Sequence, residues 1–264
     1  MRATKGLGDI KGLFDLNGKV AVVTGGSGGF GRAAAIGLAA YGADIVVTSR
    51  TLASLEDTAL EVEKLGKRAM AVSCDVADED SVKEMVAKTV AAFGKIDILV
   101  AAAGIASRFP AEEFPVAEWQ KIMDINVKGT FICCKTVGKK MIEQKTGGKI
   151  ITVSSIRGLL GHPGGYAGYG TSKGAVHLMT RQLAIEWAKH RINVNSVAPC
   201  IFWTPLTKQV LEDEKLYKIF MERIPWGRAA EPEDFIGATV FLASNAAEMV
   251  TGHILYVDGG SHAG

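Results

Sequence analysis

Short runs of valine and isoleucine recur along the chain, and longer stretches with helical periodicity separate them. Within the runs, polar and apolar residues do not alternate, which is typical of strands that are buried on both faces of a sheet. They predict seven strands, at Lys19–Val23, Ile45–Thr48, Ala69–Val72, Ile98–Ala101, Lys149–Val153, Arg191–Val197 and Ile254–Val257. A helix after nearly every strand then predicts a parallel sheet with helices on both faces.

The stretches between the strands predict these covering helices. They lie at Ala33–Tyr41, Leu52–Leu65, Ser81–Phe93, Glu118–Lys140 (one long helix) and Ser172–Lys189. No linker, composition shift or internal repeat divides the 264 residues. The expected fold class is therefore α/β: a single-domain Rossmann fold with a doubly wound, parallel, seven-stranded sheet.

Two segments differ from this regular pattern. Residues 1–14 are predicted to form an N-terminal arm before a domain over 15–264. After the sixth strand, residues 200–231 hold two prolines, two tryptophans and a predicted short helix around Val210–Arg223. Ligands of open parallel sheets bind beyond the carboxyl ends of the strands, so this second segment is a candidate substrate lid.

Composition excludes several classes of partner. The net charge is only +2 and the basic residues are scattered, so we expect no nucleic-acid or membrane partner. No apolar stretch approaches the ~18 residues of a membrane span, and Lys5, Asp9 and Lys11 interrupt any signal peptide. The cysteines have no metal-ligand spacing and predict reduced thiols, no metal site and a cytoplasmic protein; they are Cys74, Cys133, Cys134 and Cys200.

A glycine-rich turn, Thr24–Gly31, follows the first predicted strand and leads into a helix. It contains a G-x-G-x-x-G pattern formed by Gly26, Gly28 and Gly31. Glycines at such a turn permit positive φ angles and let a pyrophosphate approach backbone N–H groups at the start of the helix. Its place between a strand and a helix favours a dinucleotide site over a loop that binds nothing.

The end of the second strand bears on which dinucleotide binds. NAD sites usually have a carboxylate there for the ribose 2′-hydroxyl, whereas this chain has Ser49-Arg50. Ser49 carries no charge that would repel a 2′-phosphate and Arg50 can attract one, so NADP(H) is preferred and NAD(H) is the alternative. Arg50 as a solvated loop residue is the competing interpretation. After the third strand, Asp75-Val76 fits either an adenine contact or a loop cap.

Tyr169 and Lys173 lie four residues apart, on one face of a predicted helix. An ammonium beside a phenol is expected to lower the phenol's pKa from ~10 toward neutral pH, as an acid/base for carbonyl reduction or alcohol oxidation requires. Ser155 follows the fifth strand and can hydrogen-bond a substrate oxygen. Asn126 is a polar residue in an apolar stretch and needs a partner.

The order of glycine turn, Asn, Ser and Tyr-x-x-x-Lys over residues 15–260 resembles the short-chain dehydrogenase/reductase family. The resemblance implies that Tyr169 is the proton donor/acceptor and that Lys173 binds the nicotinamide ribose. It also implies that Ser155 polarises the substrate carbonyl, that Asn126 holds a water in a proton relay, and that Thr204 contacts the carboxamide. The expected dinucleotide contacts are Gly25, Ser27, Gly28, Gly29, Phe30, Gly31, Ser49, Arg50, Asp75, Val76, Ala102, Ala103, Gly104, Tyr169, Lys173, Pro199 and Thr204. A homotetramer or homodimer is implied, with helices 118–140 and 172–189 at the interfaces.

Two positions depart from that family's usual pattern. The usual N-N-A-G is Ala101–Gly104 here, which removes an asparagine that normally ties the sheet together. The usual P-G is Pro199-Cys200, which places a thiol near the nicotinamide. Neither change removes a catalytic group, so both bear on stability or specificity.

The expected substrate is a small secondary alcohol or ketone, with a polyol or sugar acid preferred. The opening residues 13–20 and the run 110–114 are similar to gluconate 5-dehydrogenase-like and deoxygluconate dehydrogenase-like members of the family. Arg108 and Arg157 follow strands and can clamp a carboxylate, or they are ordinary surface residues. Trp203 is a third candidate substrate contact. His162 is expected in a turn and Trp226 in the core, although both are candidates for the pocket wall.

Two other functions compete with this one. A reductase of a cyclic or carrier-bound ketone would use the same residues. A catalytically silent nucleotide-binding regulator would have lost the chemistry of Tyr169 or Lys173, and both residues are present.

Overall fold

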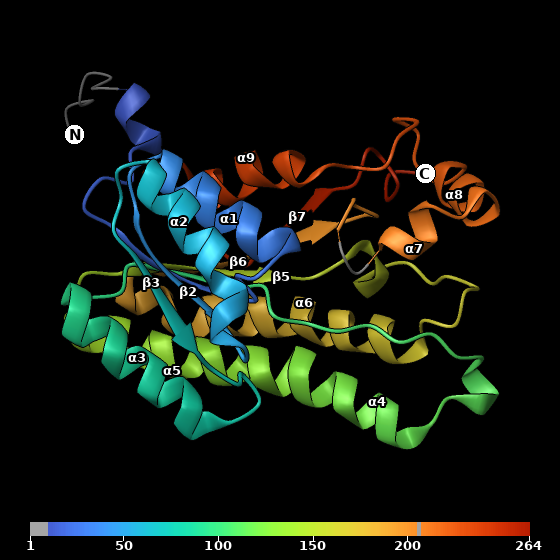
Figure 1. The fold of residues 1–264 in the computed structure, drawn as a ribbon, viewed down its shortest axis with the longest axis horizontal. Helices are drawn as coiled ribbons and strands as arrows, with labels where there is room; N and C mark the ends of the chain where they lie inside the picture. Colours follow the sequence, from blue (N-terminus) through green and yellow to red (C-terminus); the bar gives the residue numbers. More distant parts are fainter. Residues whose placement is uncertain (1–9, 205–206) are drawn as a thin grey trace, which may run out of the picture.

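The computed structural model describes residues 10–204 and 207–264. Seven strands form one parallel sheet in the order β3-β2-β1-β4-β5-β6-β7 (Figure 1). The strands are β1 (Val20–Thr24), β2 (Asp44–Ser49), β3 (Ala69–Ser73), β4 (Ile98–Ala101), β5 (Gly148–Val153), β6 (Ile192–Pro199) and β7 (Ile254–Val257). From β1 the strand order runs through β2 and β3 to one edge of the sheet and from β4 through β7 to the other edge. Open parallel sheets bind ligands at the point where the order changes, here between β1 and β4. The predicted fold class is confirmed.

Helices cover both faces of this sheet (Figure 1). One face carries α1 (Gly29–Ala40), α2 (Glu56–Lys64) and α9 (Pro232–Ala243). The other carries α3 (Glu79–Phe93), α4 (Val116–Met123), α5 (Thr130–Gln144) and α6 (Ala167–Trp187). Successive residues of β1 enter different cores, because Val22 packs beneath the α3–α5 layer and Val23 beneath the α1–α9 layer. Two cores on opposite faces explain why β1 and β2 show no polar alternation. In β6, Asn193 and Asn195 alternate with apolar residues, and both are buried.

Helix α9 has no counterpart among the predicted helices. Its start is well marked: Pro232 is its first residue, and Glu231 and Asp234 form a reciprocal capping box. Its interior is rich in phenylalanine, valine, threonine and isoleucine and contains Gly237, which lowers its helix propensity. Packing against α1 overcomes that weakness, and Phe235 is completely buried.

The predicted long helix at 118–140 is interrupted. A π-helical turn over Asp124–Gly129 separates α4 from α5, and it contains Asn126. Single π-helical turns of this kind occur often at functional sites, because they turn a side chain that a regular helix would place elsewhere.

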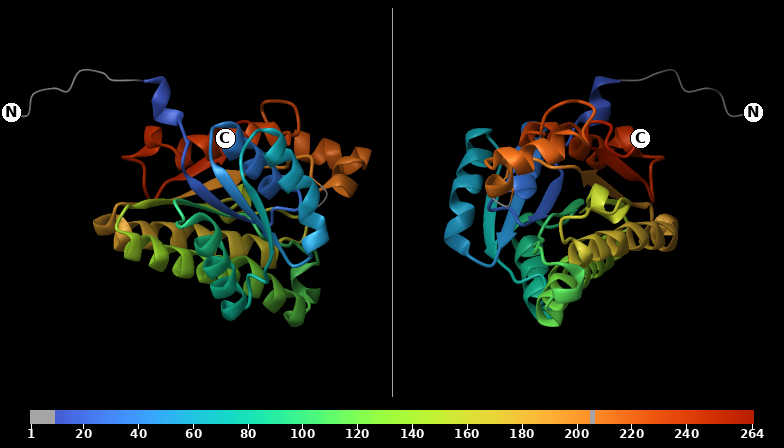
Figure 2. Two further views of the ribbon diagram at one scale, coloured as in Figure 1. Left: turned by 60° about the vertical axis from the view of Figure 1, so that its left-hand side comes forward. Right: turned by 90° about the vertical axis from the view of Figure 1, so that its right-hand side faces the viewer.

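The predicted single helix at Val210–Arg223 is two helices, α7 (Lys208–Leu211) and α8 (Glu214–Met221). Asp213 divides them, because its side chain accepts hydrogen bonds from the backbone N–H groups of Lys215 and Leu216, both at 3.0 Å, and so caps α8. Both helices lie at one end of the molecule (Figures 1 and 2).

The predicted N-terminal arm falls mostly on residues 1–9, which lie outside the described residues. Its final part, Lys11–Phe14, forms a short 3₁₀ turn that precedes β1. Over residues 10–204 and 207–264, no helix combines the length and the apolar character needed to cross a membrane.

Candidate active site

The glycine turn between β1 and α1 brings backbone close to backbone. Gly25 has a φ of +69°, and a Cβ there would lie 3.0 Å from the nitrogen and Cα of Ala103. A Cβ on Gly31 would overlap the carbonyl of Gly25. Side chains are therefore excluded where the turn meets the start of α1, and this leaves a cradle of backbone N–H groups that suits a pyrophosphate.

Thr24 ties the end of β1 to the segment that follows β4. Its hydroxyl accepts hydrogen bonds from the backbone N–H groups of Ala102, at 3.1 Å, and Ala103, at 3.2 Å. The Ala101–Gly104 run lacks the asparagine that was expected to tie the sheet together. The hydrogen bonds of Thr24, on the neighbouring strand β1, supply part of that connection. Gly104 continues this segment, where an added Cβ would lie 3.2 Å from Asn126 Oδ1 and 3.6 Å from Lys173 Nζ.

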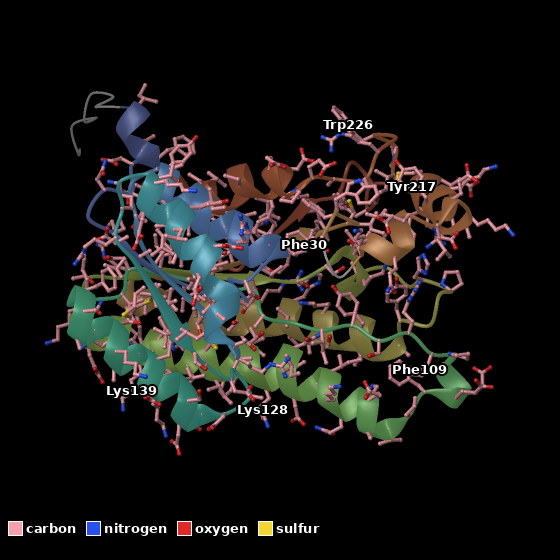
Figure 3. All side chains as sticks on the ribbon, viewed as in Figure 1. Phe30, Phe109, Lys128, Lys139, Tyr217 and Trp226 are labelled. Carbon is pink, nitrogen blue, oxygen red and sulfur yellow. The ribbon has the colours of Figure 1, made fainter. Side chains whose placement is uncertain are left out.

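The segment after β6 reaches the same turn. Pro199 ends β6, and a methyl carbon of Thr204 lies 3.4 Å from the position of a Cβ on Gly29. The ring of Phe30 packs against Phe202 and Phe235, with centroids 4.9 and 4.8 Å apart, so this side chain anchors the start of α1 in the core (Figure 3). The side chain of Phe30 is partly buried, and its contact with a dinucleotide stays a prediction.

Ser49 and Arg50 end β2 beside this cradle. The Ser49 hydroxyl donates to the carbonyl of Thr51 at 2.9 Å and lies 3.0 Å from the Ser54 hydroxyl. Arg50 is exposed, and no hydrogen bond or ion pair joins its guanidinium to another described residue. Asp75 caps the loop after β3, because its side chain accepts a hydrogen bond from the backbone N–H of Ala77 at 2.9 Å. An adenine contact by Asp75 stays a prediction.

Asn126 is completely buried and finds the partners that its position requires. Its side-chain oxygen accepts from the N–H of Ile105 at 2.8 Å, and its amide donates to the Ile105 carbonyl at 2.9 Å. The amide also donates to the Ser172 hydroxyl at 3.0 Å. Asn126 therefore joins the π-helical turn to the loop after β4 and to α6, between Tyr169 and Lys173.

Lys173, Tyr169 and Ser155 come together beyond the carboxyl ends of β4, β5 and β6. Lys173 is buried; its ammonium donates to the carbonyl of Val153 at 2.7 Å and lies 5.6 Å from the centre of the Tyr169 ring. Ser155 is also buried, and its hydroxyl accepts from the N–H of Arg157 at 3.1 Å. The four candidate catalytic residues thus occupy one site, although they lie as far as 47 positions apart in the sequence.

The expected lowering of the pKa of Tyr169 is wrong for the structure described. Burial raises the pKa of Tyr169 to about 12, and the neighbouring Ser155 hydroxyl lowers it only in part. Burial also lowers the pKa of Lys173 to about 8. Burial is thus the largest cause of both pKa shifts, and it disfavours the charged form of each group. At neutral pH Tyr169 is an acid with a proton to give, which suits carbonyl reduction.

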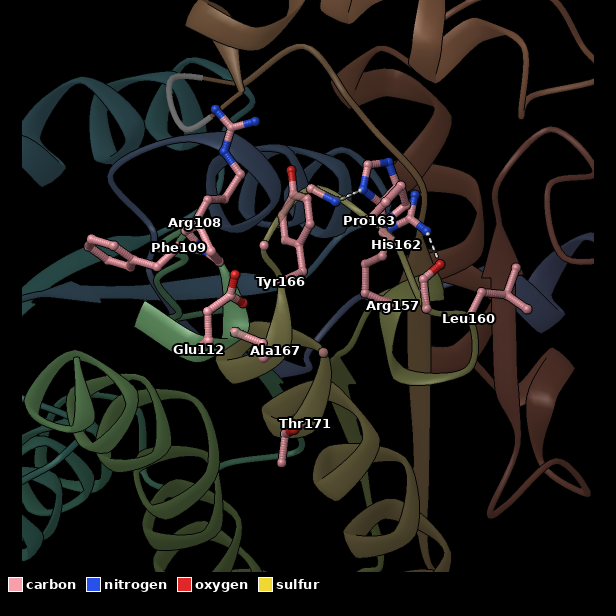
Figure 4. Close-up of a pocket in the computed structure, with 16 residues that line it drawn as sticks. Arg108, Phe109, Glu112, Arg157, Leu160, His162, Pro163, Tyr166, Ala167 and Thr171 are labelled. Carbon is pink, nitrogen blue, oxygen red and sulfur yellow. Dashed lines mark hydrogen bonds between the residues drawn. The ribbon is translucent and has the colours of Figure 1, made fainter. Parts of the chain in front are cut away.

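Two neighbouring cavities open beside these residues. The inner one, about 180 Å³, is lined by Ser155 and Tyr169. The outer one, about 990 Å³, lies between the loop after β4 and the loop before α6 (Figure 4). Arg108, Arg157 and Tyr166 line both and so form their boundary. Both arginines thus lie beside the reaction site, although Arg108 is exposed. Their role as a carboxylate clamp stays a prediction.

Two tryptophans occupy other places than expected, whereas Cys200 lies beside Ser155 and Tyr169. Trp203 does not line either cavity in the described part of the chain, because its side chain packs against the apolar cluster of α7 and α8. Trp226 was expected in the core but is 72% exposed and points outward (Figure 3). Cys200 lines the inner cavity, where burial raises the pKa of its thiol to about 12, so it is not a reactive thiolate at neutral pH.

Among the residues of the cavity walls that sequence reasoning missed are Tyr166 and Phe220. Tyr166 lacks a lysine four residues later and carries no motif, yet its ring separates the two cavities. Phe220 of α8 lines the inner cavity from the segment 200–231. The apolar face of α8 would have been the only signal for Phe220.

The comparisons with known proteins agree with this geometry. Residues 25–262 match a family model described as enoyl-(acyl carrier protein) reductase. The chain is 42% identical over 253 residues to 2-dehydro-3-deoxy-D-gluconate 5-dehydrogenase of Dickeya dadantii, covering 95% of this chain and 98% of that protein. It is 39% identical to gluconate 5-dehydrogenase of Gluconobacter oxydans, covering 94% of this chain and 96% of the relative. A crystal structure of a gluconate 5-dehydrogenase from Burkholderia cenocepacia in complex with NADP and tartrate superposes with a TM-score of 0.91 at 34% identity, covering 96% and 98% of the two chains.

Proposed function

The chain belongs to the short-chain dehydrogenase/reductase family, and on that basis we propose that it transfers a hydride between NADP(H) and the secondary alcohol of a sugar acid. The observation that carries the substrate class is the pair Arg108 and Arg157 at the boundary of the cavity that holds Ser155 and Tyr169. Two guanidinium groups recognise a carboxylate by charge and by paired N–H donors. The names of the relatives, which act on gluconate and a deoxygluconate, support the same class.

The residues of the site divide the chemistry between them. NADPH, when bound, supplies the hydride that reduces the carbonyl carbon, and NADP⁺ accepts it in the oxidation. We assign Tyr169 as the donor of the proton that the carbonyl oxygen takes up, and Ser155 as the hydrogen-bond donor that stabilises negative charge on that oxygen. Lys173, held by the Val153 carbonyl, would bind the nicotinamide ribose, and Asn126 would position a water behind it.

A substrate panel tests this proposal. We expect NADP-dependent oxidation of D-gluconate and related sugar acids with a kcat/KM about tenfold or more above that of the neutral alditols, because the alditols lack the charge that Arg108 and Arg157 read. Following nicotinamide absorbance with NADP and NAD separately checks it. Turnover of neutral alcohols or cyclic ketones without turnover of any sugar acid would contradict the substrate class, and no turnover at all would favour a nucleotide-binding regulator.

Replacing Arg50 with alanine tests the cofactor preference. We expect the KM for NADP to rise about tenfold and the KM for NAD to change less than about twofold, because a charge-assisted contact to the 2′-phosphate is lost only with NADP. Lys64→Ala, which removes another exposed cation from the nearby helix α2, is the matched control and should affect neither KM. Equal changes with both cofactors would show that Arg50 does not contact the 2′-phosphate.

We also propose that the enzyme works in the cytoplasm as a homotetramer or a homodimer. The cysteines Cys74, Cys133, Cys134 and Cys200 are free, which fits a reducing compartment. Large apolar side chains are exposed on the helices predicted at the interfaces, Phe131 on α5 and Leu178 and Ile185 on α6. Burying these side chains against a second copy would remove them from water.

A further inference from the structure

His162 lies at the boundary between the inner and outer cavities. Its ring stacks on Phe220, with centroids 5.1 Å apart and planes 16° apart, and meets the edge of Tyr166 at 5.2 Å. His162 lines the outer cavity, Phe220 the inner one and Tyr166 both. In the close-up, Tyr166 stands between Arg108 on one side and His162 on the other (Figure 4). The imidazole thus packs against two aromatic rings.

The hydrogen bonds of His162 determine which ring nitrogen carries the proton. The backbone N–H of Gly164 donates to Nδ1 at 2.9 Å, so Nδ1 acts as an acceptor and the proton of the neutral ring is on Nε2. Nε2 is buried and has no hydrogen-bond partner among the described residues. A buried donor without a partner in the protein is unfavourable, and such groups are commonly satisfied by a water or a ligand.

The charges around His162 keep it neutral and favour an anion nearby. Burial, together with the smaller effects of the charges on Arg157, Arg223 and Arg108, lowers the pKa of His162 to about 4. These arginines come from the segment after β5, the end of α8 and the loop after β4; Glu112 is the one acidic residue among those lining the outer cavity. Between pH 5 and 8 the ring is therefore an uncharged N–H donor in a positive field, a setting that suits a carboxylate.

We propose that the outer cavity holds the carboxylate end of the sugar acid, and that His162 is a specificity-determining residue whose ring turns when the substrate binds and donates its Nε2–H to that end. This inference rests on the proposed function. The reacting carbon then lies in the inner cavity at Ser155 and Tyr169, and the chain of the substrate passes the boundary formed by Arg108 and Tyr166. Acids that carry the reacting hydroxyl several carbons from the carboxylate are accepted, whereas 2-hydroxy acids, whose two groups are adjacent, cannot span both cavities.

Two substitutions at His162 separate hydrogen bonding from packing. His162→Phe keeps a ring against Phe220 and Tyr166 but removes the N–H, and His162→Gln keeps a side-chain N–H donor. With His162→Phe we expect kcat/KM for D-gluconate to fall about tenfold, through KM, because a hydrogen bond to a charged acceptor is lost. The KM for NADP and the activity on the neutral alditol should stay within about twofold, and His162→Gln should recover part of the loss. His162→Phe also removes the Nδ1 acceptor of the Gly164 N–H, so its melting temperature is measured to check that the variant is folded.

A binding measurement tests the inference apart from turnover. NADPH and D-gluconate form a complex that cannot react, because both are already reduced, so calorimetry on the enzyme–NADPH complex reports gluconate binding alone. We expect about tenfold weaker binding in His162→Phe. Equal affinities in wild type and variant would overturn the role of His162, as would equal losses for gluconate and the alditol, which indicate packing. Wild-type enzyme that binds gluconate but does not oxidise it would instead contradict the proposed function.

Discussion

Replacing Tyr169 with phenylalanine should lower kcat by a factor of about 10² to 10⁴, the range that a positioned general acid contributes. The phenol holds its proton at neutral pH, since burial raises its pKa to about 12, and it stands in the inner cavity with Ser155. Phenylalanine fills the same space, so NADPH should bind with unchanged affinity. Steady-state kinetics measures the loss, and a titration of NADPH fluorescence checks that the cofactor still binds.

Tyr41→Phe is the matched control for this substitution. Tyr41 follows α1 and is 48% exposed, so removal of its hydroxyl should leave kcat and folding unchanged. Turnover by Tyr169→Phe at the wild-type rate would show that another group supplies the proton.

Replacing Gly31 with alanine should destabilise the protein by about 3 kcal/mol and abolish tight NADP binding. The new Cβ would overlap the carbonyl of Gly25, which belongs to the backbone of the turn and cannot rotate away as a side chain can. The turn must then open, and its N–H groups lose the arrangement that suits a pyrophosphate. Urea denaturation gives the loss in the free energy of unfolding, and calorimetry gives the affinity for NADP.

Gly237→Ala provides the comparison that isolates this overlap. Gly237 also lies in a helix, α9, and a Cβ there meets no heavy atom within 4 Å. Alanine at a free helical position should raise stability by about 0.5–1 kcal/mol, because it reduces the freedom of the unfolded chain. If both variants unfold at the same urea concentration, the overlap at Gly31 does not lower the free energy of unfolding.

The strands and the catalytic set were predictable because their signals are local or fixed in order. Valine and isoleucine runs marked all seven strands, and the spacing of Tyr169 and Lys173 needs only one helix. Asn126 could be identified as a polar residue that needs a partner, but the partners themselves, Ile105 and Ser172, come from distant segments. Only the folded chain shows them.

The wrong or missing predictions share a physical cause. Each concerns a property that depends on residues brought together only in the folded chain. The pKa of Tyr169 follows burial more than its neighbour Lys173, and burial is a property of the whole site. Helix α9 is stabilised by packing against α1 although its own propensity is low. Trp226, a residue type usually found inside, lies on the surface because the segment around it has a small core of its own.

That small core has a consequence for how the protein opens. Ile201, Leu211 and Phe220 belong to a cluster separate from the two cores that sandwich the sheet, and a single bridge between Phe202 and Ala230 closes the segment at its base. Such a unit can unfold locally at a much lower free energy than the whole domain. Its departure breaks the stack between Phe220 and His162 and uncovers the inner cavity. We therefore expect mutations that loosen this cluster to change the rate of substrate exchange while the stability of the sheet stays the same.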